Sequence, residues 1–370
     1  MAVKKSTKIV TLAGLLLSVA LFNLGFSSPL YRSWHYACAK IDLTLGFRMW
    51  GCGNWPMEPV DEAHPIGNSG GEFQYYPGYW GPYFHTGIDI VVDNPAPSGP
   101  YVLTKDTGKV DNVTYPGPDC PSNESGLQLS FGGPNNGTTQ VYAHLNCPVT
   151  DPVRTAFVNR TDLPAGTEVA QVIEWPECDY HHLHFETWDM SGAVEPVLKL
   201  FPRHDKDFPV VENISFTQNG STIEDFPPPV VTVKGKVDIV AQAYDRQFVT
   251  PTQNHKTGVL KIRYQVSDAT TGNVVKTGKT IDFSTIPDSS KTTVLFRTAG
   301  DFVSSSDYCG DERYYYVVTN VDDNNPANFA EEFAWDTTKH RDGDYRVEVR
   351  AWDASSNAGL KAKRVKIRNN

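Results

Sequence analysis

Histidines and carboxylates that could do chemistry gather in three short segments of the first half of the sequence. The segments are His85-Thr-Gly-Ile-Asp89, Tyr142-Ala-His144-Leu145 and His181-His-Leu-His184-Phe-Glu186. Imidazole and carboxylate groups are the usual ligands of catalytic zinc, which takes three protein ligands and leaves a fourth position open for water. Hydrolysis at such a site also needs groups that move protons and stabilise an oxyanion. The segments therefore contain the side-chain types of a hydrolytic metal site.

The spacing of His85 and Asp89 requires a bend in the chain. Four residues of a straight strand span about 13 Å, too far for two ligands that each lie about 2 Å from one ion. A helix would bring them together, but Gly87 and the β-branched run that follows it oppose a helix. We therefore expect a bend at residues 86–87, with Gly87 as the residue that tolerates it. Taken alone, the segment fits two interpretations equally well. One is a pair of metal ligands, and the other is a surface histidine with an unrelated turn aspartate.

His182 and His184 belong to a segment that reads as a strand. Residues at i and i+2 project from one face, about 6.6 Å apart, so one can bind a metal while the other stands beside the attacking water. Spacing alone does not say which is which. Glu186 continues the same face and could orient an imidazole. His181 points the other way and is interpreted as structural.

His144 lies in a further expected strand, Thr138 to Leu145. Taken alone, it could equally be a partly buried histidine whose hydrogen bonds are satisfied within the core. Cys147 follows three residues later. In an exported chain a cysteine is more often in a disulfide than on a metal, so we do not count it as a ligand.

In this order, the patterns H-x-G-x-D, Y-A-H-L and H-L-H-F-E resemble the LytM or lysostaphin-like family of zinc peptidases. The resemblance covers about residues 80–190 and includes the stretch from Gly166 to Ile173. Members of this family cut the peptide cross-links of bacterial cell walls, and a few cut glycine-rich proteins. The resemblance implies that His85, Asp89 and His184 bind Zn²⁺, and that His144 and His182 act in proton transfer and oxyanion stabilisation. The loop 174–181 departs from the family, because it is bulky and acidic where the family has small residues.

The function expected from this resemblance is a zinc metalloendopeptidase that hydrolyses peptide bonds in peptidoglycan cross-links or stem peptides. Two alternatives remain open. One is a catalytically silent binding or regulatory module, although the presence of all five site residues argues against it. The other is a secreted protease for ordinary proteins, which would use the same residues.

The amino terminus predicts export. Lys4, Lys5 and Lys8 precede an apolar run over residues 9–26, which is typical of a signal peptide or of an uncleaved membrane anchor. We assign residues 1–28 to this leader, and both readings place the rest of the chain in the periplasm or outside the cell. The six cysteines fit an oxidising compartment, and the pairs Cys38–Cys52 and Cys120–Cys147 are plausible on separation alone.

The net charge of −10 bears on partners. Nucleic-acid binding calls for a basic face that releases phosphate counterions, and no basic cluster persists beyond the leader. Nucleic acid is therefore excluded as a partner. The expected partners are wall peptides or another peptide substrate, with the run 9–26 as a membrane anchor if it is not cleaved.

The rest of the sequence predicts a mainly β protein with two domains. Residues 29–58 form an irregular aromatic-rich segment, residues 59–205 a LytM-like antiparallel peptidase domain, and residues 206–370 an antiparallel immunoglobulin-like β-sandwich of alternating strands. In the peptidase domain we expect strands at residues 88–93, 127–131, 138–145, 168–174 and 182–187, with a hairpin between the second and third, and an extended loop over residues 146–165. In the sandwich, residues 292–297 are one of the expected strands. The second domain is expected to dock to wall, sugar or a protein, or to be a structural appendage. Its loop aspartates could bind calcium, although solvated turn aspartates are commoner. These are Asp322, Asp323, Asp342 and Asp344.

Overall fold

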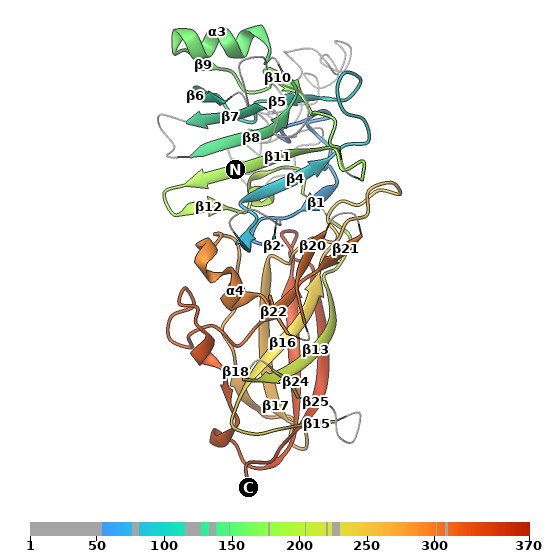
Figure 1. Cartoon of the computed structure of the whole chain (residues 1–370), viewed down its shortest axis with the longest axis vertical. Helices are drawn as coiled ribbons and strands as arrows, with labels where there is room; N and C mark the ends of the chain where they lie inside the picture. The colour runs from blue at the N-terminus through green and yellow to red at the C-terminus, as the bar shows by residue number, and fades with distance from the viewer. Residues whose placement is uncertain are drawn as a thin grey trace, which may run out of the picture.

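The computed structural model describes residues 54–75, 81–114, 127–132, 138–147, 149–176, 178–203, 205–219, 221–223, 230–300, 302–307 and 310–370. These residues form mainly antiparallel β-sheet, which confirms the expected fold class. Two parts are stacked along the long axis of the molecule, and the chain ends at the far tip of the lower part (Figure 1).

The upper part is built on an eight-stranded sheet in the order β1-β4-β11-β8-β7-β6-β9, with β12 paired to β11. Two short sheets accompany it, β10-β5 and β2-β3. The strands are β1 (Ile66–Asn68), β2 (Phe73–Gln74), β3 (Tyr83–Phe84), β4 (Gly87–Val91), β5 (Tyr101–Leu103), β6 (Gly108–Thr114), β7 (Leu127–Gly132), β8 (Thr139–Leu145), β9 (Asp162–Leu163), β10 (Glu168–Gln171), β11 (His182–Asp189) and β12 (Gly192–Val194).

Most strands expected in the upper part are confirmed. The runs at 88–93, 127–131, 138–145, 168–174 and 182–187 correspond to β4, β7, β8, β10 and β11, and β7 pairs antiparallel with β8 as the hairpin signal predicted. The expectation of a plain loop over residues 146–165 is wrong. That stretch contains helix α3 (Asp151–Asn159), whose Val153 and Ala156 are buried against the core.

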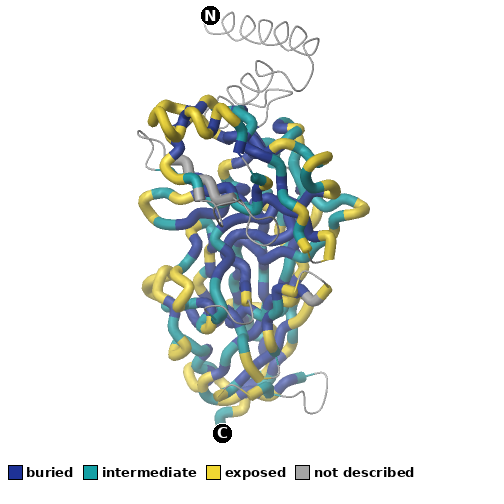
Figure 2. The backbone as a smooth tube through the Cα atoms, turned by 45° about the horizontal axis from the view of Figure 1, so that its top comes forward, coloured by how far each residue is buried: buried dark blue, intermediate teal, exposed yellow. Residues whose placement is uncertain are grey.

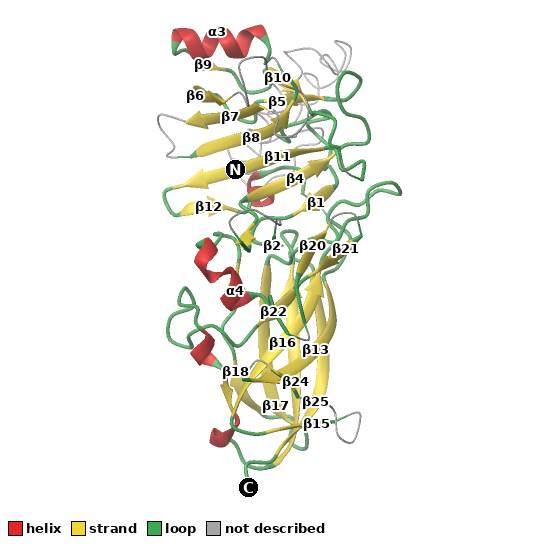
Figure 3. Cartoon of the chain, viewed as in Figure 1, coloured by secondary structure: helices red, strands yellow, loops and turns green. Residues whose placement is uncertain are grey.

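The lower part is a sandwich of two sheets (Figure 3). One has the order β14-β13-β16-β22 with β23 beside β16, and the other has the order β15-β25-β24-β17-β18 with β19 beside β17. β15 runs parallel to β25, so the expected purely antiparallel pairing is wrong at this edge. The immunoglobulin-like identity of the sandwich stays a prediction. Its strands are β13 (Val210–Gln218), β14 (Ser221–Thr222), β15 (Val231–Val233), β16 (Lys236–Tyr244), β17 (Lys261–Asp268), β18 (Val274–Thr277), β19 (Ile281–Asp282), β22 (Tyr315–Val317), β23 (Trp335–Asp336), β24 (Gly343–Trp352) and β25 (Ala358–Ile367).

One expected strand of the sandwich is helical. Residues 292–297, read as a β run, begin with helix α4 (Thr292–Leu295). The turn η2 (Ser289–Lys291) precedes it, and the carboxylate of Asp288 caps that turn by accepting a hydrogen bond from the Ser290 N–H. Leu295 and Phe296 are fully buried in the sandwich core, so tertiary packing overrides the β propensity of the segment. Other short elements are η1 (Pro196–Lys199), η3 (Glu331–Phe333), η4 (Thr337–Lys339), β20 (Ser305–Asp307) and β21 (Asp311–Arg313).

Two hydrophobic cores meet at the junction of the parts, and buried backbone continues across it (Figure 2). The sandwich core includes Phe73 and Phe84 of the upper part, whereas the upper core includes Leu260 and Ala354 of the lower part. Trp55 and Met57 are also buried in the upper core. The end of the predicted irregular segment therefore covers an apolar face, and residues 29–53 lie outside the described residues.

The described residues leave the predictions on export and disulfides open. Cys147 and Cys178 are described, and neither is a free thiol. The other four cysteines lie outside the described residues, so both expected pairings stay predictions. Within the described part of the chain, no helix has the length and apolarity needed to cross a membrane. The predicted leader, residues 1–28, lies outside that part.

Candidate metal centre

Three neighbouring strands bring the three motifs together. β11 lies between β4 and β8, so His184 is the cross-strand partner of both Asp89 and Ala143. His85 precedes β4 in the short connection from β3, and these two strands belong to different sheets. The chain therefore breaks between the two strands at residues 85–86, one residue before the bend expected at residues 86–87. The side chains of Leu183 and Phe185 point into the upper core, which leaves His182 and His184 on the opposite face.

The three expected ligands converge. His85 Nε2 lies 3.3 Å from Asp89 Oδ1 and 3.0 Å from His184 Nδ1, and His184 Nδ1 lies 2.9 Å from Asp89 Oδ1. Three ligands in a tetrahedral shell with bonds of about 2.0–2.1 Å would be separated by about 3.3 Å. Among the described residues this is one of two groups of histidine and acidic side chains close enough to share an ion.

The outer hydrogen bonds set the direction of each lone pair. His85 Nδ1 lies 3.2 Å from the carbonyl oxygen of Ser69, and His184 Nε2 lies 2.9 Å from Glu186 Oε1. Since both partners accept, these nitrogens carry the hydrogens in the neutral rings. The other nitrogen of each ring then directs a lone pair at the Asp89 carboxylate. Burial would lower the pKa of both rings, but without a metal Asp89 raises the pKa of His85, and Asp89 and Glu186 raise the pKa of His184 to about 10. Protons then take the place of a cation between the three groups, so the residues fit a zinc ion that displaces those protons.

Glu186 holds the imidazole of His184 from behind, as the sequence suggested. Its carboxylate accepts hydrogen bonds from Thr86 Oγ1 at 2.5 Å and from Trp188 Nε1 at 2.6 Å. Burial would raise the pKa of Glu186, but the hydrogen bond from His184 outweighs it and lowers the pKa to about 2. The carboxylate is therefore ionised and increases the basicity of the ring.

We expect Glu186→Gln to weaken zinc binding about 10- to 100-fold, because the neutral amide orients His184 less firmly and adds no charge. Zinc affinity measured by competition with a chromogenic chelator tests this. Glu212→Gln, at an exposed position of β13, is the matched control. Equal affinities for the two variants would contradict the role of Glu186.

Gly87 serves a different purpose from the one expected. Its φ is not in the left-handed region, and it lies at the start of β4. A Cβ there would lie 2.5 Å from the carbonyl oxygen of Phe185 and 2.9 Å from Glu186 Cγ. The residue is therefore required for the close approach of β4 to β11.

Gly87→Ala should lower the free energy of unfolding by about 1–3 kcal/mol, because the methyl group pushes two core strands apart. Gly343→Ala is the control, since its Cβ would meet its nearest neighbour, Tyr345 Cε2, at 3.9 Å. Thermal unfolding followed by circular dichroism compares the two. Identical midpoints would show that β4 and β11 can separate without cost.

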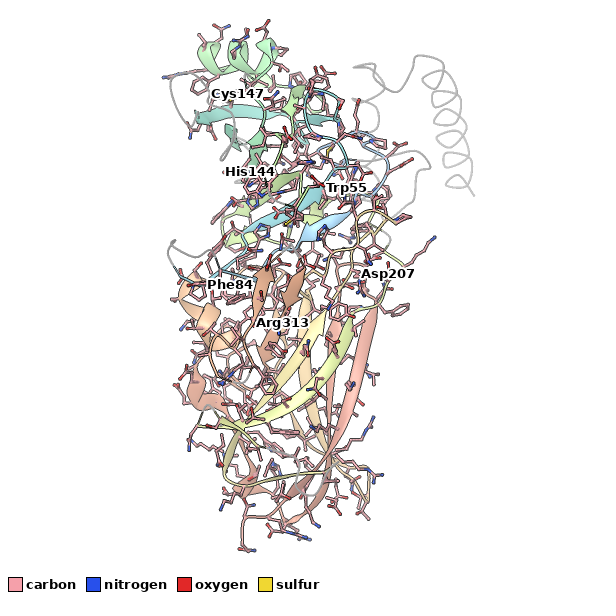
Figure 4. The ribbon with its side chains drawn as sticks, turned by 45° about the vertical axis from the view of Figure 1, so that its right-hand side comes forward. Trp55, Phe84, His144, Cys147, Asp207 and Arg313 are labelled. Atoms are coloured by element: carbon pink, nitrogen blue, oxygen red, sulfur yellow. The ribbon has the colours of Figure 1, made fainter. Side chains whose placement is uncertain are left out.

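The two remaining histidines lie beside the triangle. His182 Nε2 lies 3.7 Å from Asp89 Oδ2, and its Nδ1 lies 2.8 Å from the carbonyl oxygen of Tyr180. The ring centroids of His144 and His182 are 4.7 Å apart, and Trp175 stands 4.7 Å from His144 and 5.1 Å from His182. Figure 4 labels His144 in the upper part.

His144 is anomalous in two ways. Its φ is 61°, in the left-handed region, which is uncommon for residues other than glycine. Among the described residues, no hydrogen-bond partner reaches its buried Nδ1. The alternative of a satisfied core histidine is therefore not supported. Both features cost stability, which is typical of a residue retained for function.

The electrostatics divide the site into charged and neutral groups. Burial would raise the pKa of Asp89, but the imidazoles of His182 and His85 hold it well below its usual range. Burial lowers the pKa of His144, with His182 and His184 adding to the effect, and burial also lowers the pKa of His182. Asp89 is therefore ionised, and both histidines outside the triangle are neutral at pH 7.

Sequence reasoning missed the supports of the site. Glu72 accepts hydrogen bonds from Ser69 N at 2.8 Å and from Asn68 Nδ2. Ser69 provides the carbonyl group for His85, and Asn68 Oδ1 accepts from Tyr180 Oη at 2.5 Å. Glu72 also accepts from Gly258 N and from Tyr314 Oη of the lower part, at 2.8 and 3.2 Å. The sandwich thus contributes to the packing behind the metal centre. The run of small and polar residues 67–71 is the only local signal for this turn.

His181 is structural, in agreement with the sequence. Its Nδ1 accepts a hydrogen bond from the backbone N–H of Trp175 at 2.9 Å. This bond ties the loop 174–181 to the start of β11. The loop that departs from the family pattern thereby places its indole ring against the two neutral histidines.

Comparisons with known proteins add limited information. Neither the family models nor the curated proteins contain a match. Among solved structures, LytU is similar at 21% identity and a TM-score of 0.27, over 39% of this chain and 91% of that one. A mutant catalytic domain of the prophage-encoded M23 protein EnpA from Enterococcus faecalis has 19% identity and a TM-score of 0.24, over 36% and 92%. The catalytic domain of the antimicrobial peptidase lysostaphin from Staphylococcus simulans has 22% identity and a TM-score of 0.23, over 35% and 87%. At these TM-scores the likeness carries no argument, and the function has to be inferred from the site.

Proposed function

We propose that the chain is a zinc metalloendopeptidase that hydrolyses peptide bonds outside the cytoplasm. The observation that carries the proposal is the triangle of His85 Nε2, Asp89 Oδ1 and His184 Nδ1, with sides of 2.9 to 3.3 Å. A zinc ion held there would supply a Lewis acid that activates water and polarises a peptide carbonyl group.

The residues around the triangle supply the remaining functions. His182 donates its Nδ1 hydrogen to the Tyr180 carbonyl oxygen, so in the neutral ring Nε2 has a free lone pair and can take a proton from water. The neutral ring of His144 can donate an N–H hydrogen bond to the oxyanion, and the proton that His182 has taken from water can pass to the leaving amine. Trp175 packs against both rings and restricts their movement.

The proposed substrates are the cross-link or stem peptides of peptidoglycan. Three motifs in the order of the LytM or lysostaphin-like family support this class, and the charged and apolar leader supports export to the periplasm or beyond. The proposed partner of the sandwich is the wall, a sugar or another protein. A protease for ordinary proteins would use the same five residues, so the substrate has to be tested directly.

Digestion of purified cell wall tests the proposal. Mass analysis should find new peptide termini, which disappear with a chelator and return when zinc is restored. A parallel digestion of casein separates the alternatives. Cleavage of casein but not of wall would favour the protease for ordinary proteins. A zinc-loaded protein that cleaves neither substrate would overturn the proposal in favour of a silent binding module.

A further inference from the structure

A second cluster of carboxylates lies where the upper part joins the sandwich. Asp205 belongs to the segment between the two parts, Asp245 directly follows β16, and Asp353 directly follows β24. Each offers one carboxylate oxygen, and these three atoms lie within 4.8 Å of one another. Figure 4 labels Asp207, two residues after Asp205, on the flank where the parts meet. None of the four calcium candidates expected from the loop aspartates belongs to this group.

The three carboxylates are buried, and only some of their oxygens have partners. Their residues are 9%, 0% and 4% exposed, in chain order. Within the described part of the chain, both oxygens of Asp245 and Oδ2 of Asp205 are buried and lack a hydrogen-bond partner. Among the described basic side chains, none forms an ion pair with any of the three. A buried carboxylate without a counter-charge is strongly destabilising, so a partner for these oxygens is required.

The remaining contacts of the cluster hold it in place. Asp205 Oδ1 accepts from Asp207 N at 3.0 Å. The two oxygens of Asp353 accept from the backbone and side-chain nitrogens of Asn357, both at 2.7 Å. The Asn357 side chain also donates to the carbonyl oxygens of Asp205 and Asp207. Ser355 fixes the same segment, because its hydroxyl accepts from Asp205 N and donates to the Arg203 carbonyl oxygen. Asp205 and Asp353 are therefore held together by one hydrogen-bonded frame.

We propose that Asp205, Asp245 and Asp353 bind a calcium ion that joins the linker to both sheets of the sandwich. Calcium prefers carboxylate oxygens at 2.3–2.6 Å, so two oxygens on opposite sides of one ion lie about 4.6–5.2 Å apart at most. The observed spacing meets that limit. Calcium also takes six to eight oxygens, so water or carbonyl oxygens complete the shell. All three donors are hard oxygens without nitrogen or sulfur, which distinguishes this site from the metal centre on β4 and β11.

The position of the site gives the ion a structural role. β16 and β24 belong to different sheets, and the segment 201–209 leads from the upper part to β13. One ion bound to all three therefore ties both layers and the linker together. Burial raises the pKa of Asp205 to about 6 and raises the pKa of Asp245 and Asp353 as well, and the neighbouring carboxylates add to the effect at Asp205 and Asp245. Calcium would relieve this repulsion.

Calorimetry and thermal unfolding of the purified protein test the proposal, with the metal first removed and zinc then restored. Calcium titrated by isothermal calorimetry should bind with one site per chain and raise the unfolding midpoint by about 5 °C. Asp245→Asn should abolish both effects. In calcium-free buffer the same variant should unfold at a higher temperature than the unchanged protein, because a buried charge is gone.

Glu332→Gln is the matched control, because it changes an exposed carboxylate of the same sandwich and should leave the calcium response intact. The competing explanation is that shared protons satisfy the cluster. In that case calcium neither binds nor shifts the midpoint, and Asp245→Asn stabilises the protein at every calcium concentration. That outcome would overturn the calcium site, and it would leave the peptidase proposal untouched.

Discussion

Asp89→Asn is expected to remove zinc and to eliminate peptide-bond hydrolysis. Asp89 supplies the only negative charge of the triangle and lies within 3.3 Å of both ring nitrogens that face it. An asparagine of the same shape keeps one oxygen but loses the charge. Loss of a partner in the outer shell costs 10- to 100-fold in metal affinity, so loss of the charged ligand itself should cost more than about 100-fold. Activity should fall in proportion to the zinc retained.

Zinc content by plasma mass spectrometry, with wall-peptide release measured on the same sample, tests this expectation. Asp179→Asn is the control, since this exposed carboxylate lies on the loop before β11 and its left-handed φ of 53° suits asparagine. His184→Ala is a second variant that removes a ligand without changing Asp89. Circular dichroism confirms that each variant is folded. A folded Asp89→Asn protein with a full complement of zinc would remove Asp89 from the ligand set.

The site could be predicted from sequence because each motif sits on a strand whose neighbours are fixed by the sheet. β4, β11 and β8 are adjacent, so Asp89, His184 and Ala143 align as cross-strand partners. The two-residue period of β11 then places His182 and Glu186 on the same face as His184. The bend before β4 follows from distance alone. The spacing of residues within each motif thus predicts which side chains lie close together on the sheet.

The supports of the site could not be predicted, because they depend on contacts between segments far apart in the chain. Glu72 bonds to Gly258, 186 residues away, and Tyr180 bonds to Asn68, 112 residues away. The role of Gly87 became visible only through the Phe185 carbonyl oxygen on the facing strand. The β propensity of the β-branched residues gave a wrong prediction at α4. These residues form a helix because Leu295 and Phe296 complete the sandwich core.

The calcium cluster shows the same limitation. Asp245 and Asp353 each follow an aromatic residue at the end of a strand, and Asp205 lies in a linker rich in charge. Nothing in their spacing distinguishes them from the exposed aspartates of other turns. Only the burial of Asp245, with two unpartnered oxygens, separates this group from solvated carboxylates.

His144→Asn is expected to lower kcat by about 10²- to 10⁴-fold while zinc binding and stability are preserved. Burial keeps the pKa of His144 well below its usual range, so at pH 7 its ring is neutral and offers one N–H donor and one nitrogen lone pair. An amide keeps a polar group but cannot take a proton. Asparagine also tolerates the left-handed φ of 61° that this position requires. The substitution therefore separates proton transfer from backbone conformation.

The stability of this variant distinguishes a functional residue from a structural one. Because His144 Nδ1 is buried and unpartnered, replacing the ring removes an unfavourable burial and should not lower the unfolding midpoint. His340→Asn, at a partly exposed position of the sandwich, should leave kcat unchanged. A His144→Asn protein that unfolds at a lower temperature yet retains full kcat would make His144 a packing residue. His182 would then be the only histidine available to move protons beside the triangle.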